Sequence, residues 1–230
     1  EAISRGVQEN KITVVTNAVE RSITEVINES ELYPTAVKQL QQEEETCVIG
    51  YIGSLREMEG VNLTAQAVAK LIQKGHNVRF FVLTGESGQH ELRQLCASLG
   101  IEDSSVILGP VPHKEVAAFY NLIDIFVVSR PNSRVTQLVT PLKPFEAMAM
   151  SRTVIASKLP ALEEIIQHER TGLLYQADDL DDLTRVIERC VLEPKLREHL
   201  GHAAKDWVLN NRTWDVVVKK TLDAYEKVKK

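Results

Sequence analysis

The stretch CVIGYIGSLREMEGVNLTAQAVAKLIQKGHNVRFFVL, residues 47–83, decides the fold. It begins and ends with a continuous apolar run rich in β-branched and aromatic residues, as in strands that are buried on both faces of a sheet. Between the two runs, apolar residues recur at helical spacing, and Gly75 suits the position just after a helix end. Strand, helix and strand in this order predict two parallel strands joined by a crossover helix.

The same alternation continues outward from this stretch. Further apolar runs predict strands at residues 12–16, 105–108, 124–128, 153–157 and 172–175. Helix-period segments lie between most of these runs, and only helices are predicted after Asp179. We therefore predict an α/β fold: a Rossmann-like, doubly wound parallel sheet with helices on both faces and extra C-terminal helices.

Composition sets limits on the class of protein. The chain has 230 residues, of which 43% are hydrophobic and 26% charged, as in ordinary globular proteins. No apolar run reaches the ~18 residues of a membrane span, and a net charge of −5 argues against nucleic acid as a partner. The beginning has neither Met nor a signal peptide, which indicates a fragment of a longer protein. Cys47, Cys96 and Cys190 lie in or beside apolar stretches, so we expect reduced, buried thiols and a cytoplasmic protein.

Two loops that follow predicted strands carry polar chemistry, and ligands of open parallel sheets bind at the carboxyl ends of the strands. After the strand at 47–52, Gly53 and Ser54 let backbone amides approach an anion, and Arg56 offers a guanidinium suited to phosphate. The alternative is a plain glycine turn with a solvated arginine. After the strand at 78–83 come Thr84 and Gly85, for which a tight turn into the next helix is the simpler interpretation.

A third loop follows the strand at 124–128 and leads into the helix of TPLKPFEAMAM, residues 140–150. It contains Arg130, and Lys143 adds a positive charge in the first helical turn, where free N–H groups bind anions. Glu146 can accept hydrogen bonds from two hydroxyls, as a ribose supplies. The alternative is an i,i+3 surface pair of Lys143 with Glu146, worth only ~0.2–0.5 kcal/mol. Because Glu146 precedes the apolar AMAM, we expect its carboxylate to have a partner.

Several motifs in order resemble a known family: VVTNAVE, GYIGSLREMEG, GPVPHKEVAAFY, DIFVVSR, PLKPFEAMAM and LEEIIQHERTGLLY. Over about residues 12–190 the chain is similar to the C-terminal, donor-nucleotide-binding domain of retaining glycosyltransferases of family four, which have the GT-B fold. The resemblance implies transfer of a hexose from a UDP- or GDP-sugar to a glycan or glycoconjugate acceptor in bacterial polysaccharide biosynthesis. It also implies a missing N-terminal acceptor domain as partner, so that this fragment alone is inactive. No metal or other cofactor is expected.

The resemblance also assigns roles to single residues. Arg56 and Lys143 become the catalytic groups that stabilise the departing nucleoside diphosphate. The implied nucleotide-sugar-binding residues are Gly53, Ser54, Thr84, Gly85, Val111, Pro112, Arg130, Thr140, Leu142 and Glu146. The chain departs from the family in three places. Ser54 and Glu59 stand where the family often has Arg and Lys, and the first of the family's two glutamates would fall near position 138, where the chain has Gln137 and Leu138.

The predicted parts are an N-terminal strand and connector at 1–46, a Rossmann-like nucleotide-sugar-binding domain at 47–212, and a C-terminal helix at 213–230. In the intact protein a peripheral position at the inner face of the membrane is a further expectation. Three alternatives stay open. They are a non-catalytic sugar-nucleotide-binding module, which the change at Gln137 and Leu138 favours, a GT-B phosphorylase or epimerase, and a flavodoxin-like partner-binding domain without nucleoside-diphosphate binding.

Overall fold

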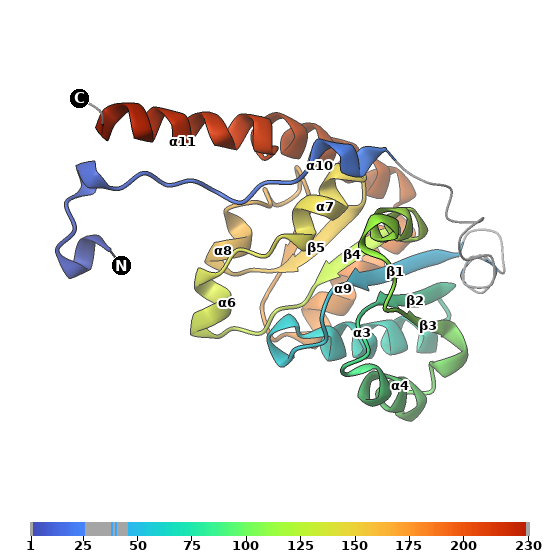
Figure 1. Cartoon of the computed structure of the whole chain (residues 1–230). Helices are drawn as coiled ribbons and strands as arrows, with labels where there is room; N and C mark the ends of the chain where they lie inside the picture. Colours follow the sequence, from blue (N-terminus) through green and yellow to red (C-terminus); the bar gives the residue numbers. More distant parts are fainter. Residues whose placement is uncertain (1, 26–37, 39, 41–45, 229–230) are drawn as a thin grey trace.

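Six parallel strands form the central sheet of the computed structural model, which describes residues 2–25, 38, 40 and 46–228. The strands are β1 Cys47–Ile52, β2 Val78–Leu83, β3 Ser105–Leu108, β4 Ile125–Val128, β5 Thr153–Ser157 and β6 Leu173–Tyr175. They lie in the order β3-β2-β1-β4-β5-β6 (Figure 1). The chain therefore reverses its direction across the sheet between β1 and β4, which places a switch point at the carboxyl end of β1. This confirms the predicted doubly wound fold.

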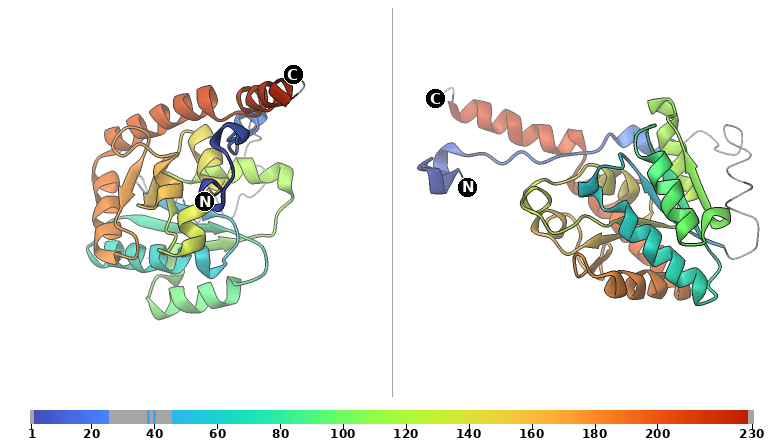
Figure 2. Two further views of the ribbon diagram at one scale, coloured as in Figure 1. Left: turned by 90° about the vertical axis from the view of Figure 1, so that its left-hand side faces the viewer. Right: turned by 90° about the horizontal axis from the view of Figure 1, so that it is seen from below.

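Helices cover both faces of the sheet (Figures 1 and 2). The helices are α3 Val61–Gln73, α4 Gln89–Ser98, α5 Val116–Phe119, α6 Arg134–Leu138, α7 Lys143–Ala149, α8 Pro160–Glu163, α9 Leu180–Leu192, α10 Pro194–Asn211 and α11 Trp214–Val228. Short 3-10 turns include η3 Arg21–Thr24, η4 Glu57–Glu59 and η7 Tyr120–Leu122. Helix α3 packs on α9, and α7 packs on α10. In the described part of the chain, none of these helices has both the length and the apolar character needed to cross a membrane.

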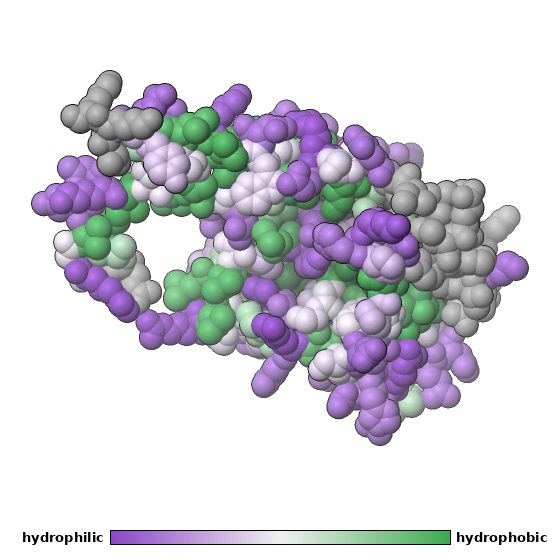
Figure 3. Space-filling view, viewed as in Figure 1, coloured by the Kyte–Doolittle hydropathy of each residue, from purple (hydrophilic) through white to green (hydrophobic). Residues whose placement is uncertain are grey.

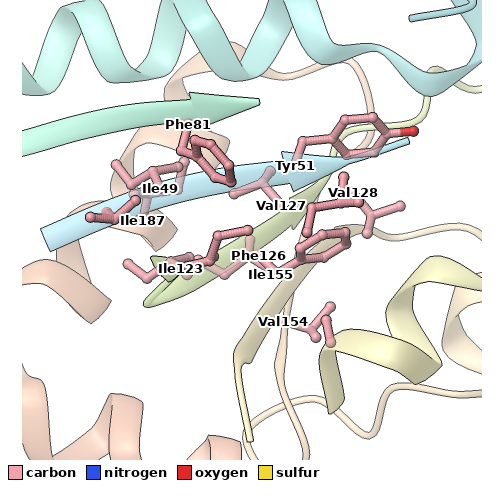
Figure 4. Packing of buried hydrophobic residues seen from close by; sticks show 14 of the residues in the cluster. Ile49, Tyr51, Phe81, Ile123, Phe126, Val127, Val128, Val154, Ile155 and Ile187 are labelled. Carbon is pink, nitrogen blue, oxygen red and sulfur yellow. The ribbon is translucent and has the colours of Figure 1, made fainter. Parts of the chain in front are cut away.

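The sheet forms the hydrophobic core, because its central strands are covered on both faces. All six residues of β1 and all four of β4 are buried. The ring of Phe126 on β4 lies 5.9 Å from that of Tyr51 on β1 and 5.7 Å from that of Tyr120, so aromatic side chains link both strands to η7. Figure 4 shows the packing of this cluster. The continuous apolar runs of the sequence thus have the burial that was predicted for them.

The predicted strand at residues 12–16 is wrong. These residues are extended but belong to no strand, and the side chain of Val14 is 69% exposed. A β-branched run becomes a strand only when it pairs with a neighbouring strand, and residues 12–16 pair with none of the six strands of the sheet. The segment instead extends on the same side of the molecule as α11, where Val19 forms an isolated bridge with Thr213 (Figure 1). Most of the connector predicted up to residue 46 lies outside the described residues.

Other boundaries differ in smaller ways. The helix that was expected to start near Pro141 begins at Lys143, and the third loop contains a short helix, α6, that was not predicted. Helix α11 begins next to the expected boundary at residue 213. The three cysteines are free and buried, as predicted. Burial raises the pKa of the Cys47 thiol to about 12 and that of Cys190 to about 11.

Candidate functional site

A hollow lies at the carboxyl ends of β1 and β2, at the switch point of the sheet. It is lined by Ile52, Gly53, Leu83, Thr84, Gly85, Pro110, Val111, Val116 and Lys143. The structure thus brings together five residues that the sequence analysis had drawn from four separate segments: Gly53, Thr84, Gly85, Val111 and Lys143. Ligands of open parallel sheets bind in this position because the strand ends and the loops that follow them leave a crevice.

Close backbone contacts shape the floor of the hollow. The Gly53 amide donates to the Leu83 carbonyl at 3.0 Å, and the Thr84 amide donates to the Leu108 carbonyl at 2.9 Å. Gly109 has a φ of +108°, and a Cβ there would lie 2.0 Å from the Thr84 carbonyl oxygen, so this position requires glycine. The ends of β1, β2 and β3 are therefore fixed relative to one another.

Thr84 presents an unusual polar group at this floor. The residue is only 5% exposed, and its hydroxyl has no hydrogen-bond partner among the described residues. A buried hydroxyl without a partner costs about 1–3 kcal/mol, and most such groups in folded proteins are satisfied. Since Thr84 also lines the hollow, a polar ligand there could supply the missing partner.

Lys143 lines the hollow from the start of α7, and Glu146 lies beside it, one turn further along the helix. The Lys143 ammonium lies 3.1 Å from Glu146 Oε2, so the i,i+3 pair considered for the sequence is present. The Tyr120 hydroxyl also donates to Oε2 at 2.6 Å, from a residue that is fully buried. Burial, together with the charge of Glu146, raises the pKa of Tyr120 well above its usual value, so the phenol stays a donor. Glu146 therefore has the buried partner that its position next to AMAM predicted.

Arg130 does not reach the hollow. Its Nε and Nη2 donate to the two carboxylate oxygens of Glu59 at 3.0 and 2.8 Å, and its Nη1 donates to the Val139 carbonyl at 3.0 Å. The side chains are 5% and 13% exposed. A buried charge needs such a partner, and the pair fastens the loop after β4 to the start of α3. These contacts argue against Arg130 as a direct phosphate ligand.

The remaining predicted residues lie around the rim. Ser54, Arg56 and Pro112 are exposed and do not line the hollow. The Thr140 carbonyl accepts a hydrogen bond from Asn17 Nδ2 at 3.3 Å. Leu142 lines an adjacent groove, together with Glu146 and residues of the N-terminal segment such as Ala18. Among the described residues, no group of three or more His, Cys, Asp or Glu side chains could hold a metal ion.

Comparison with known proteins assigns the family. The model of the family described as glycosyl transferases group 1 matches residues 33–207. The chain belongs to this family. The match confirms the resemblance of the motifs to the C-terminal domain of GT-B glycosyltransferases.

Individual relatives and structures of glycosyltransferases agree with this assignment. An uncharacterised glycosyltransferase of Methanocaldococcus jannaschii is 25% identical over 190 residues, which are 80% of this chain and 46% of that protein. A glycosyltransferase from Rickettsia africae superposes with a TM-score of 0.83 at 19% identity, covering 97% of this chain and 59% of that one. Anabaena HepE, solved in complex with UDP-glucose, has a TM-score of 0.76 at 17% identity over 99% of this chain and 60% of its own. The chain thus spans about half the length of the curated relatives that it matches.

The residues that depart from the usual motifs of the group 1 family can be located in the structure. Glu59 is the partner of Arg130, so the acidic residue is neutralised inside the protein. Gln137 and Leu138 lie in the unpredicted helix α6, where Leu138 is 61% exposed. Gln137 Nε2 donates to Asn132 Oδ1 at 2.7 Å. Neither side chain lines the hollow.

Sequence reasoning missed Tyr120 as part of the site and the ion pair of Glu59 with Arg130 beside it. Both meet partners that are distant in the sequence: Tyr120 contacts Glu146, and Glu59 contacts Arg130. A signal for Tyr120 exists, because a tyrosine in the apolar segment VAAFYNLI needs a partner for its buried hydroxyl. No comparable signal identifies the partner of Glu59.

Proposed function

We propose that this chain is the donor-nucleotide-binding part of a glycosyltransferase that moves a hexose from a nucleoside-diphosphate sugar to a glycan or glycoconjugate acceptor, with retention. One observation carries the proposal: the hollow at the switch point joins Gly53, Thr84 and Lys143, and Glu146 stands at its edge. A diphosphate needs a cation and backbone amides, and a ribose needs an acceptor of two hydroxyl hydrogen bonds. HepE, which has the same fold, was solved with UDP-glucose.

In the proposed mechanism, Lys143 stabilises the negative charge that develops on the departing nucleoside diphosphate. Such electrostatic stabilisation is most effective where water is excluded, and the Lys143 side chain is only 33% exposed. The Thr84 hydroxyl supplies a further contact to the donor, and Gly53 lines the site beside it. Arg56 is the second proposed cation, and it must approach from its exposed position when the donor binds. Glu146 holds the ribose.

The acceptor is proposed to bind to a further domain of the intact protein, with the reaction in the cleft between the two. Donor and acceptor must be aligned and shielded from water, so the chain alone is proposed to bind the donor without transferring sugar. Apolar side chains exposed on α11 offer a surface for that domain (Figure 3). The buried, free cysteines fit a reducing, cytoplasmic location.

A thermal-shift panel of UDP, GDP, ADP and NAD tests the proposal. Stabilisation by a nucleoside diphosphate at concentrations above its dissociation constant is the expected result. Stabilisation by NAD alone, or by none of the four, would contradict the proposal. The second candidate, a non-catalytic sugar-nucleotide-binding module, is favoured by Gln137 and Leu138. It predicts nucleotide binding without transfer by the intact protein, whereas a glycosyltransferase transfers sugar from the matched donor.

A further inference from the structure

Tyr120 is held in place both by the packing of its ring and by a hydrogen bond from its hydroxyl. The residue is 0% exposed and lies in η7, between α5 and β4. Its ring packs on Phe126 of β4, with centroids 5.7 Å apart and the ring planes at 41°. Phe126 in turn stacks on Tyr51 of β1. The position of the Tyr120 ring is therefore set by the two central strands of the sheet.

The hydroxyl of Tyr120 is aimed at one oxygen of Glu146. It donates to Oε2 at 2.6 Å, a short distance typical of hydrogen bonds to a charged acceptor. The Lys143 ammonium lies 3.1 Å from the same oxygen but 3.4 Å from Oε1. The strong contacts thus concentrate on Oε2, while Oε1 keeps most of its capacity to accept hydrogen bonds.

Oε1, the less engaged of the two carboxylate oxygens, belongs to a side chain that reaches solvent. Glu146 is 21% exposed at its side chain and lines the groove beside the switch-point hollow. A free glutamate side chain populates several rotamers, and ordering it costs conformational entropy. A fixed donor behind the carboxylate removes that cost in advance of ligand binding.

We propose that Tyr120 is a positioning residue, which holds the Glu146 carboxylate so that Oε1 accepts hydrogen bonds from the ribose hydroxyls of the donor nucleotide. This role rests on the proposed function. Tyr120 does not touch the ligand and acts only through Glu146. It follows that loss of the Tyr120 hydroxyl weakens the binding of ribose-containing nucleotides and spares nucleotides that lack these hydroxyls.

The test compares Tyr120→Phe with the wild-type chain, using calorimetric titration with UDP, GDP and the 2′,3′-dideoxy analogue of each. We expect affinity for the ribonucleotide to fall roughly 5- to 20-fold, less than for direct loss of Glu146 because Tyr120 acts only through it, and affinity for its dideoxy analogue to change less than about 2-fold. Tyr175→Phe is the matched control, because Tyr175 is an equally buried tyrosine on β6 and should leave both affinities unchanged. The ratio of the two affinities does not depend on the fraction of protein that is folded.

A second arm repeats Tyr120→Phe in a Glu146→Ala background. If Tyr120 acts through Glu146, its substitution there has no further effect on ribonucleotide affinity. Equal losses for the ribonucleotide and its dideoxy analogue, an unchanged affinity in Tyr120→Phe, or a full effect without Glu146 would each overturn the positioning role alone. Failure of the wild-type chain to bind any of these nucleotides would overturn the proposed function, and the role of Tyr120 with it.

Discussion

Helices α10 and α11 follow one another and are both amphipathic, yet they use their apolar residues differently. In α10 the apolar side is packed into the molecule, and Leu200, Ala204 and Val208 are fully buried. Among the residues of α11 whose burial the structure describes, only Val217 is buried, whereas Trp214, Val218, Leu222 and Tyr225 are 42–65% exposed. Figure 3 shows apolar side chains gathered along α11, on the side where the N-terminal segment also projects.

This difference separates what the domain needs for its own fold from what it offers to a partner. Exposed large apolar residues that are clustered mark interaction surfaces more often than scattered ones do. The sheet and the helices packed on it, α7 and α10 among them, form the hydrophobic core, and the switch-point site lies at the edge of that core. Helix α11 adds little to it. Stability and nucleotide binding should therefore respond to substitutions in the first region and hardly at all to substitutions in the second.

The largest expected effect is the loss of stability when the ion pair of Glu59 with Arg130, beside the site, is broken. Arg130→Ala leaves the Glu59 carboxylate buried without its partner, so we expect the free energy of unfolding to fall by about 3–5 kcal/mol. Urea denaturation measures this loss. Arg56→Ala is the control, because Arg56 is exposed on the loop that carries Glu59 and its removal should change stability by less than about 0.5 kcal/mol. A loss below about 1 kcal/mol in Arg130→Ala would show that the pair does not fasten the loops together.

A matched pair of leucines tests the contrast between the two helices directly. Leu200→Ala on α10 should lower the free energy of unfolding by about 2–5 kcal/mol, because it empties a fully buried site. Leu222→Ala on α11 should lower it by less than about 0.5 kcal/mol. Chemical denaturation of both variants under one set of conditions gives the comparison. Similar losses at the two positions would mean that α11 belongs to the same core.

Within the site, Glu146→Ala should weaken the binding of a nucleoside diphosphate without unfolding the domain. Loss of hydrogen bonds to a charged group corresponds to about 1.5–3 kcal/mol, or roughly a 10- to 150-fold lower affinity. Calorimetric titration measures the affinity, and far-ultraviolet circular dichroism checks the fold. Unchanged affinity in a folded variant would remove Glu146 from the ribose site.

A smaller and more selective effect is expected at Lys143. Lys143→Ala should lower affinity for the nucleoside diphosphate about 5- to 10-fold and leave affinity for the bare nucleoside unchanged, because the ammonium pairs with phosphate. Arg56→Ala should act in the same direction and more weakly, since Arg56 starts from an exposed position. Equal losses for nucleoside and diphosphate would show that Lys143 contacts another part of the ligand, or none.

The sequence was informative where a local pattern alone determines the structure. The runs at residues 47–52 and 78–83 form strands because both faces of the sheet are covered, and the loops after them meet because parallel strands end at one edge. The run at residues 12–16 is also rich in β-branched residues but forms no strand, since a strand requires a partner strand beside it and this run has none. The spacing of apolar residues along the chain carries no information about such a partner strand.

Contacts between distant segments limited the prediction of the site. Arg130 and Glu59 were each assessed as separate loop residues. They lie 71 positions apart, and nothing in either loop indicates that they form one buried ion pair. The same holds for Tyr120, which contacts Glu146 because η7 and α7 both lie against β4. Lys143, Thr84 and Gly53 were found because each follows directly on a strand end or begins a helix there.

Calorimetric titration of the wild-type chain with UDP and GDP, each measured beside its nucleoside, tests most directly whether the switch-point hollow binds a nucleoside diphosphate. The expected result is saturable binding of at least one diphosphate, with the matching nucleoside bound more weakly because Lys143 is proposed to contact the phosphate groups. Glu146→Ala and Lys143→Ala should each reduce that binding. The absence of binding by either diphosphate, or binding that neither substitution affects, would contradict the assignment of this site.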